Sequence, residues 1–167
     1  MLDTARLYLR EQTEEDLDRL YEIYSSENIT RYMEGLYDNR EEELEFTRAY
    51  IKNMYQFYGY GVWIVCLKEN DEIIGRAGLS NRMVDGINEL ELGYVIGEEY
   101  QGKGYAVEVC SAICKFAKEW LCAGKLVCFM RKENIPSIRL AKKLGFDYVT
   151  EVAVEEGDIF AYYEKVL

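Results

Sequence analysis

An apolar stretch that runs through a glycine-rich loop into a helix-like pattern constrains this chain more than any other part of its sequence. The stretch is Leu90–Ile96, and the loop contains Gln101-Gly102-Lys103-Gly104. Glycine allows positive φ angles and a close approach of the backbone to a ligand. A helix that begins near Tyr105 would add free amides and the positive end of its dipole, so the segment predicts a phosphate site. An ordinary strand-to-helix turn stays an alternative.

Apolar residues then recur at three- and four-residue steps over about four turns, which predicts an amphipathic helix. They are Ala106, Val109, Cys110, Ile113, Phe116, Ala117, Trp120 and Leu121. We expect this apolar face to pack in the core and to hold the glycine loop in place.

The chain of 167 residues, of which 49% are hydrophobic, suits a single domain over residues 1–167. No apolar run approaches the roughly 20 residues that cross a bilayer, and residues 1–10 lack the layout of a signal peptide. Most of the five cysteines lie within apolar stripes and read as reduced core residues. The sequence therefore predicts a cytoplasmic protein with no membrane partner.

The absence of histidine excludes several classes of enzyme. Ser-His-Asp hydrolysis, Cys-His acyl transfer and most catalytic zinc sites all need an imidazole. Without histidine or a Cys-x-x-Cys pair, we expect no bound metal. The net charge of −11 argues against nucleic acid as a partner, because lysine and arginine dominate phosphate contacts. A cationic substrate suits this charge, although plain solubility also explains it.

Periodicity and turn residues predict seven strands and four helices. The strands are expected at Arg6–Gln12, Gly61–Leu67, Glu72–Leu79, Leu90–Ile96, Leu126–Met130, Phe146–Val154 and Ile159–Val166, and the helices begin at Thr13, after Asn39, near Tyr105 and at Pro136. This order departs from a doubly wound dinucleotide fold, which has its glycine motif after the first strand. An oxidoreductase that binds a dinucleotide at the loop nevertheless stays an alternative.

Two motifs carry a resemblance to a known family. The first is Gln101-Gly102-Lys103-Gly104-Tyr105-Ala106, and the second is a helix that begins at Asn134-Ile135-Pro136-Ser137 and ends in Gly145-Phe146. Together with the order of elements over nearly the whole chain, they resemble the GCN5-related N-acetyltransferase (GNAT) superfamily, and within it the branch that acetylates ribosomal-protein N-termini and polyamines. The resemblance implies a three-layer α/β (α+β mixed) fold. Its mostly antiparallel mixed sheet of about six to seven strands would splay at the fourth and fifth strands, with about four flanking helices.

The resemblance also implies that acetyl-CoA is the co-substrate. Backbone amides of the glycine loop would hold its diphosphate, and the main chain of Val95 and Ile96 would pair with its pantetheine arm. The cofactor-binding residues implied in this way are Val95, Ile96, Gln101, Gly102, Lys103, Gly104, Tyr105, Ala106, Asn134 and Ser137. Helix capping is a second reading of Asn134 and Ser137, and a solvated loop position is a second reading of Lys103.

The chemistry of amine acetylation points to two catalytic candidates. A lysine-like amine, with a pKa of about 10.4, must first lose a proton at a cost of roughly 4 kcal/mol at neutral pH. Glu89 and Glu91 share one face of the strand that feeds the loop, and we favour Glu91 as a base that acts through water. A solvent-facing carboxylate is the alternative. Many family members have a tyrosine acid where this chain has Ala141, so Ser137 is the candidate acid, as in the ribosomal-protein branch.

The acceptor is expected to be an amine, namely a peptide or protein N-terminus, a polyamine or a small amine. By family analogy the acceptor mouth lies between residues 28–39 and 155–158, and its carboxylates are Glu34, Asp38, Glu155 and Glu156. Aromatic residues of the segment 50–60 either stack on the acceptor or pack under the second helix. The absence of a tyrosine at Ala141 also suggests a sensor or partner module that binds acyl-CoA with weak or no catalysis. The sequence leaves a homodimer open.

Overall fold

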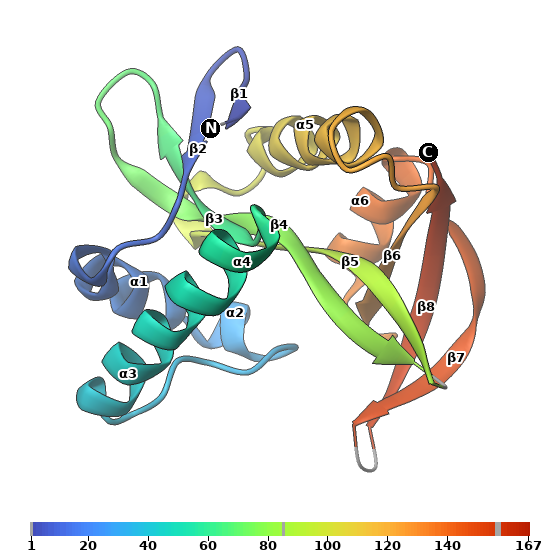
Figure 1. The fold of residues 1–167 in the computed structure, drawn as a ribbon, viewed down its shortest axis with the longest axis horizontal. Coiled ribbons are helices and arrows are strands. Elements are labelled where there is room, and N and C mark those ends of the chain that lie inside the picture. Colours follow the sequence, from blue (N-terminus) through green and yellow to red (C-terminus); the bar gives the residue numbers. More distant parts are fainter. Residues whose placement is uncertain (1, 85, 156–157) are drawn as a thin grey trace.

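The computed structural model describes residues 2–84, 86–155 and 158–167, and its strands form one mixed sheet (Figure 1). The described strands are β1 (Leu2–Asp3), β2 (Leu7–Arg10), β3 (Val62–Leu67), β4 (Ile73–Val84), β5 (Ile87–Ile96), β6 (Lys125–Met130), β7 (Asp147–Glu155) and β8 (Asp158–Val166). They lie in the order β1-β2-β3-β4-β5-β6-β8-β7, and the pair β5 and β6 alone is parallel in the described part. The strand that the sequence patterns missed is β1, because two residues are too short for a periodic signal.

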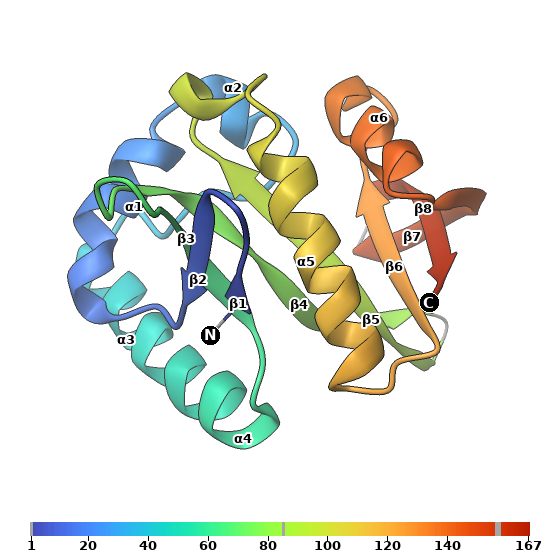
Figure 2. The ribbon, with the colours of Figure 1, turned by 90° about the horizontal axis from the view of Figure 1, so that it is seen from above.

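Helices cover both faces of the sheet and complete three layers. The first face carries α1 (Leu17–Tyr24), α2 (Glu27–Thr30), α3 (Arg40–Tyr50) and α4 (Gln56–Tyr58), and the other carries α5 (Tyr105–Glu119) and α6 (Ile135–Lys143) (Figure 1, Figure 2). A π-helical segment, Ile51–Tyr55, joins α3 to α4. The predicted three-layer α/β fold is confirmed. Within the described chain, every helix is too short or too polar to cross a membrane.

The helix after the glycine loop packs most of its predicted apolar stripe into the core. Its fully buried residues are Val109, Cys110, Ile113 and Ala117. They join one core cluster with Leu79 of β4, Leu92 of β5 and Leu126 of β6. The prediction that Trp120 packs in the core is wrong. This side chain is 74% exposed, because the helix ends at Glu119 and the chain then turns through Cys122 at a φ of 51°.

The strands β4 and β5 are longer than the predicted strands Glu72–Leu79 and Leu90–Ile96, and they form a hairpin. Its strands stay paired out to Val84 and Ile87, with Ser80 opposite Glu91 and Met83 opposite Asn88. The outer half carries mostly polar side chains, so it lacks the apolar pattern that marks a strand in sequence. Backbone pairing and the ion pair between Arg82 and Glu91 hold it together.

The parallel strands β5 and β6 separate soon after they meet. Among the described residues they pair only at Glu91 and Val127. β5 then continues to Ile96 while β6 turns toward α6 (Figure 2). The predicted splay between the fourth and fifth predicted strands is therefore confirmed, since these strands are β5 and β6.

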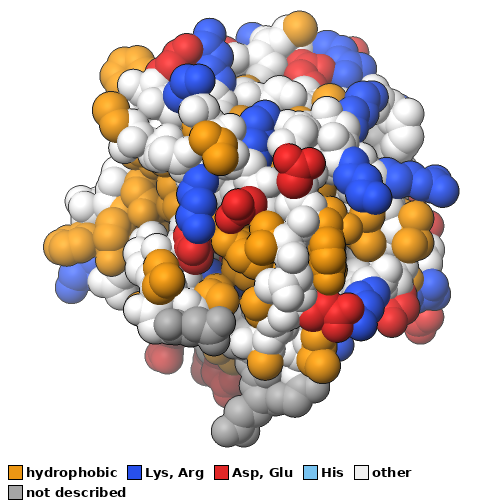
Figure 3. Space-filling view, turned by 90° about the vertical axis from the view of Figure 1, so that its right-hand side faces the viewer, with side chains coloured by type: hydrophobic (Ala, Val, Ile, Leu, Met, Phe, Trp, Pro, Cys, Tyr) orange, Lys and Arg blue, Asp and Glu red, His pale blue; other side chains and the backbone are white. Residues whose placement is uncertain are grey.

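The sheet ends at β7, and the face over β7 and β8 mixes apolar and charged side chains (Figure 3). Tyr148 and Val149 of β7 and Ile159 of β8 are exposed. All five cysteines are free thiols, and four of them are buried, as the apolar stripes indicated. The exposed thiol is Cys122.

Candidate active site

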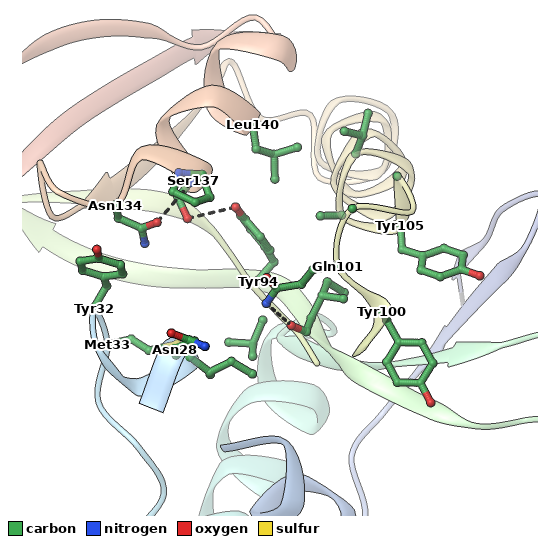
Figure 4. A pocket seen from close by; sticks show the side chains of 18 residues that line it. Asn28, Tyr32, Met33, Tyr94, Tyr100, Gln101, Tyr105, Asn134, Ser137 and Leu140 are labelled. Carbon is green, nitrogen blue, oxygen red and sulfur yellow. Dashed lines mark hydrogen bonds between the residues drawn. The ribbon is translucent and has the colours of Figure 1, made fainter. Parts of the chain in front are cut away.

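A cavity of about 420 Å³ occupies the splay between β5 and the helices α5 and α6 (Figure 4). Residues from four parts of the fold line it, and they include Asn28, Tyr32, Tyr94, Val95, Ile96, Gln101, Gly102, Gly104, Tyr105, Ala106, Asn134 and Ser137. Nine of the ten residues implied as cofactor-binding thus lie around one space. The tenth, Lys103, is outside this lining, and its ammonium group lies 5.2 Å from the centre of the Tyr100 ring.

Strand β5 presents main-chain groups to this cavity. The N–H of Gly97 donates to the carbonyl of Ile74 on the neighbouring strand β4 at 2.8 Å. Alternate residues of an antiparallel strand face the same neighbour, so the main chain of Val95 also faces β4, which differs from the expectation that Val95 pairs with the pantetheine arm. The main-chain groups of Tyr94 and Ile96 face the opposite side, where β6 has diverged. The side-chain amide of Gln101 donates to the carbonyl of Ile96 at 2.9 Å.

The glycine loop has the geometry of an anion site. Gly102 and Gly104 have φ angles of 73° and 84°, which disfavour any residue with a Cβ. Helix α5 begins at Tyr105, and its first internal bond runs from the N–H of Glu108 to the carbonyl of Gly104. The N–H groups of the residues before Glu108 have no partner within the helix, and Tyr105, Ala106 and Val107 all line the cavity.

Polar contacts brace the turn Glu98–Tyr100 that precedes the loop. The carboxylate of Glu98 accepts from the hydroxyl of Ser26 at 2.7 Å and from the side-chain amide of Asn28 at 2.8 Å. Arg19 of α1 pairs with Glu99 at 2.8 Å, and the hydroxyl of Tyr100 donates to Glu72. The loop is therefore tied to the helices on the other face of the sheet.

The wall formed by α6 carries Asn134 and Ser137. The side-chain oxygen of Asn134 accepts from the N–H of Ser137 at 3.3 Å, so the helix cap is present. The Tyr94 and Ser137 hydroxyl oxygens lie 3.1 Å apart across the splay (Figure 4). Burial raises the pKa of Tyr94 well above its usual range, although the contact with Ser137 acts in the opposite direction. Tyr94 therefore keeps its proton at neutral pH and can donate to Ser137.

Sequence reasoning missed Tyr94. It lies in an apolar strand, where a tyrosine reads as packing, and no motif singles it out. The signal that could have found it is the alternation of side chains along a strand. A tyrosine on the helix-covered face of a strand that borders a splay lies at one wall of that gap.

A second cavity, of about 580 Å³, adjoins the first. The two share lining residues, namely Tyr32, Met33, Tyr94, Asn134, Ser137 and Leu140. Glu91 and Ala141 line the second cavity only. Ser137 and Tyr94 thus stand where the two cavities meet.

Of the two strand carboxylates, Glu91 alone is among the residues that line a cavity. It is 8% exposed, so it is not the solvent-facing group of the alternative reading. Its Oε2 lies 2.8 Å from the Nε of Arg82 and 3.4 Å from the hydroxyl of Ser80. Glu89 instead pairs with the ammonium group of Lys125 at 2.8 Å.

The segments expected to flank the acceptor are partly represented around the second cavity. Glu34 lines it from the first segment and Asp158 from the last turn, whereas Asp38 does not line it. Glu156 and the Glu155 side chain lie outside the described residues. None of the aromatic residues between positions 50 and 60 lines either cavity. Tyr55 is buried and donates to the carbonyl of Val62 at 2.5 Å, in agreement with the packing alternative, whereas Phe57 and Tyr58 are exposed and do not fit it.

In the described part of the chain, no group of three or more histidine, cysteine, aspartate or glutamate side chains could hold a metal ion. The site is thus described by its cavities, its loop amides and its hydroxyl and carboxylate groups.

Comparisons with known proteins agree with this geometry. Residues 6–147 match the model of the acetyltransferase (GNAT) domain family. The uncharacterized N-acetyltransferase p20 of Bacillus licheniformis is 30% identical over 146 residues, which are 87% of this chain and 81% of that protein. The structure of an acetyltransferase from Agrobacterium tumefaciens str. C58 aligns with a TM-score of 0.82 at 25% identity, covering 99% of this chain and 94% of the other.

The fold is also shared with RimL, the ribosomal L7/L12 alpha-N-protein acetyltransferase, in its complex with coenzyme A. That alignment has a TM-score of 0.77 at 17% identity and covers 98% of this chain and 96% of RimL. By its name RimL acetylates a ribosomal protein, as the branch suggested by the two motifs does, and its likeness to this chain is one of fold. The family match replaces the dinucleotide-binding alternative, because it spans the glycine loop and most of the fold. The chain belongs to the GNAT family of acetyltransferases.

Proposed function

We propose that this GNAT member transfers the acetyl group of acetyl-CoA to a primary amine by direct attack in a ternary complex. The acceptor would be a peptide or protein N-terminus, a polyamine or a small amine. The observation that carries the proposal is the meeting of two cavities at Ser137 and Tyr94. A ternary complex needs this arrangement, because two substrates must reach one point from different sides.

The first cavity would take the diphosphate and the pantetheine arm of CoA. Free amides at the start of α5 and the glycine loop would hold a diphosphate. The main-chain groups of Tyr94 and Ile96 would pair with the amides of the pantetheine arm, in the way that an added strand pairs with a sheet edge. The complex of RimL with coenzyme A supports this assignment by analogy of fold. When bound, acetyl-CoA supplies the thioester carbon that an amine attacks.

In the second cavity, Glu91 would accept the proton that the amine must lose, through a bridging water. A positioned general base contributes a factor of about 10² to 10⁴. Arg82 and Ser80 hold the carboxylate in one orientation at the cavity wall. Glu34 and Asp158, which line the same cavity, would add negative charge that attracts an ammonium group.

On the leaving side, Ser137 would donate a hydrogen bond to the thiolate of CoA. The Tyr94 hydroxyl is placed to donate to the Ser137 oxygen, which frees the proton of Ser137 to turn toward the cavity. A thiol with a pKa around 8.5 is a fair leaving group near neutral pH, so one hydroxyl donor is enough. Ala141 lines the second cavity without a proton donor of its own.

Titration calorimetry with acetyl-CoA and NAD tests the binding half of the proposal. We expect the protein to bind acetyl-CoA and to show no measurable heat with NAD. The reverse preference would overturn the assignment. A screen of peptides, polyamines and small amines, with detection of free thiol, then tests catalysis.

The variant Glu91→Gln tests the base. We expect kcat/KM to fall about 10²-fold at pH 7, because the amine loses its proton acceptor. The difference in kcat/KM between Glu91→Gln and the unmodified enzyme should become smaller as the pH rises through the pKa of the acceptor amine. The matched control is Glu89→Gln, which changes a carboxylate on the same strand face and should reduce kcat/KM less than threefold. Equal activity of Glu91→Gln and the unmodified enzyme would contradict the role of Glu91.

A sensor or partner module that binds acyl-CoA is the second candidate. Two observations favour it: the ion pair that occupies Glu91, and the alanine at position 141. It predicts binding of acetyl-CoA without thiol release on any acceptor.

We also expect a cytoplasmic location, which the free, mostly buried cysteines support.

A further inference from the structure

Arg6 lies directly behind the glycine loop. Its Nη1 donates to the carbonyl of Lys103 at 3.0 Å, and its guanidinium carbon is 4.3 Å from the centre of the Tyr105 ring. Gly104 and Tyr105 are among the residues that line the first cavity, whereas Arg6 and Lys103 are not. Arg6 therefore contacts the loop from the side away from the cavity.

This contact orients the peptide group between Lys103 and Gly104. In a trans peptide the C=O and the N–H point in opposite directions. Because Arg6 holds the Lys103 carbonyl on its own side, the N–H of Gly104 must point away from Arg6. Of the two sides of the loop, that direction leads toward the cavity.

Arg6 also neutralises a carboxylate at the start of α5. Glu108 lies in the first turn of that helix, and its Oε2 is 2.8 Å from the Nε and 2.7 Å from the Nη2 of Arg6. Its Oε1 accepts from the Thr4 hydroxyl at 2.6 Å and from the Arg6 N–H at 2.8 Å. Burial raises the pKa of Glu108, but these bonds outweigh it and hold the pKa below its usual range.

An ionised carboxylate at this position would oppose an anionic ligand. The positive end of the helix dipole attracts both Glu108 and a diphosphate, so an unpaired Glu108 would compete with the ligand. The charge-assisted bonds from Nε and Nη2 of Arg6 to Oε2 remove that competition while they keep the loop rigid. The side chain of Arg6 is 48% exposed, so its contacts and not mere burial define its position.

We infer that Arg6 is a positioning residue of the CoA site, which directs the Gly104 amide at the diphosphate and cancels the charge of Glu108. The inference rests on the proposed function, since it needs a diphosphate in the first cavity. Arg6 is far from the two family motifs along the sequence, and it is outside the cavity lining.

The test is a double-mutant cycle with Arg6→Gln and Glu108→Gln, read by calorimetry with CoA. We expect Arg6→Gln to raise the Kd for CoA about tenfold, because the Lys103 carbonyl is released and Glu108 is left unpaired. Glu108→Gln should raise it less than threefold. The double variant should regain part of the lost affinity, because the competing charge is gone while the Lys103 carbonyl stays released.

Acetylpantetheine, which lacks the diphosphate, separates positioning from a general loss of structure. With it as the acetyl donor, kcat/KM of Arg6→Gln should match that of the unmodified enzyme. Arg48→Gln is the matched control, since Arg48 also pairs with a glutamate, Glu14, through its Nε and Nη2. It should leave the Kd for CoA unchanged.

Three outcomes would overturn the inference. They are an unchanged Kd for CoA in Arg6→Gln, equal losses with CoA and acetylpantetheine, and a double variant no better than Arg6→Gln. Failure of the unmodified protein to bind CoA would overturn the proposed function as well. In that way the two failures are distinguishable.

Discussion

At the scale of single residues, the proposed chemistry would depend on two hydroxyl groups that meet across the splay. Tyr94 comes from β5 and Ser137 from α6, and their oxygens are 3.1 Å apart. Because the raised pKa of Tyr94 keeps it protonated, it is suited to donate a hydrogen bond but not to give up its proton. We therefore assign the contact with the leaving thiolate to Ser137 and the orientation of Ser137 to Tyr94.

The variant Tyr94→Phe tests this assignment. It removes one hydrogen bond worth about 1 kcal/mol, so kcat should fall about fivefold. Ser137→Ala should lower kcat by at least as much, and the double variant should be no worse than Ser137→Ala, because the two residues act as one unit. Steady-state kinetics with saturating acetyl-CoA measure the effect. Tyr148→Phe, on the exposed edge strand, is the control, and a similar loss there would contradict the role of Tyr94.

At the scale of elements, the site depends on how the loop and the first helix are anchored. The loop needs two glycines at positive φ, and α1 follows a short 3₁₀ turn, Glu14–Asp16, that is tied to β2. Asp16 is 4% exposed and receives two bonds from the guanidinium of Arg10, at 2.6 and 2.8 Å. Both features are local, and each can be tested by one substitution.

Gly104→Ala should weaken CoA binding and lower the stability of the fold. The nearest atom to an added Cβ is 3.5 Å away, so space is available, and the cost comes from a φ of 84°. A left-handed residue with a Cβ costs roughly 1 to 2 kcal/mol. Thermal unfolding and calorimetry with CoA measure the two effects. Gly124→Ala, which has open space and no positive φ, should change neither quantity.

Asp16→Asn should destabilise the protein by about 3 kcal/mol at pH 7, because it breaks a buried ion pair. Burial raises the pKa of Asp16, but bonds from Arg10 and Thr13 hold it below its usual range. A lowered pKa in the folded state stabilises the protein above the unfolded value of about 3.9. The difference in the free energy of unfolding between Asp16→Asn and the unmodified protein should therefore shrink as the pH falls through the lower pKa of Asp16 in the folded state.

Urea unfolding at pH 7 and near pH 3 checks this expectation. Asp18→Asn is the control, because Asp18 is 78% exposed in its pair with Arg40. Its replacement should change the free energy of unfolding by less than about 1 kcal/mol. A constant difference between Asp16→Asn and the unmodified protein at both pH values would contradict the proposed linkage.

At the scale of the whole molecule, one pair of strand residues joins two halves of the sheet. Among the described residues, strands β1 to β5 and strands β6 to β8 pair at Glu91 and Val127, and the first cavity lies farther along β5, at Tyr94, Val95 and Ile96. A ligand that pairs with β5 in the splay would thus contact both halves, through the strand on one side and through α6 on the other.

Amide hydrogen exchange in the presence of CoA tests this arrangement. We expect the N–H groups of Tyr94 and Ile96 to gain protection, because they face the splay and would bond to the pantetheine arm. The N–H of Val95 should already be protected without ligand, because it faces β4. Gained protection at Val95 alone would mean that the ligand does not pair with this strand.

Local patterns were enough to predict much of this protein. Glycines next to a strand and before an apolar stripe predicted the loop and α5, since φ preference and helical periodicity are properties of neighbouring residues. The same applies to the Asn134 cap and to most strands. The patterns failed where a backbone partner rather than a side-chain period supports the strand, as in β1 and the outer half of the β4–β5 hairpin, and at Trp120, where the chain turns.

Contacts between distant segments could not be read in this way. The pairing of Tyr94 with Ser137, of Arg6 with Glu108 and of Glu91 with Arg82 depends on which strands are neighbours and where β5 leaves β6. The amino-acid sequence by itself determined most of the elements, because those follow from local conformational preference, and its two motifs indicated the family. Only the tertiary structure decided which hydroxyl, carboxylate and main-chain groups share a cavity, because that follows from the packing of segments far apart along the chain.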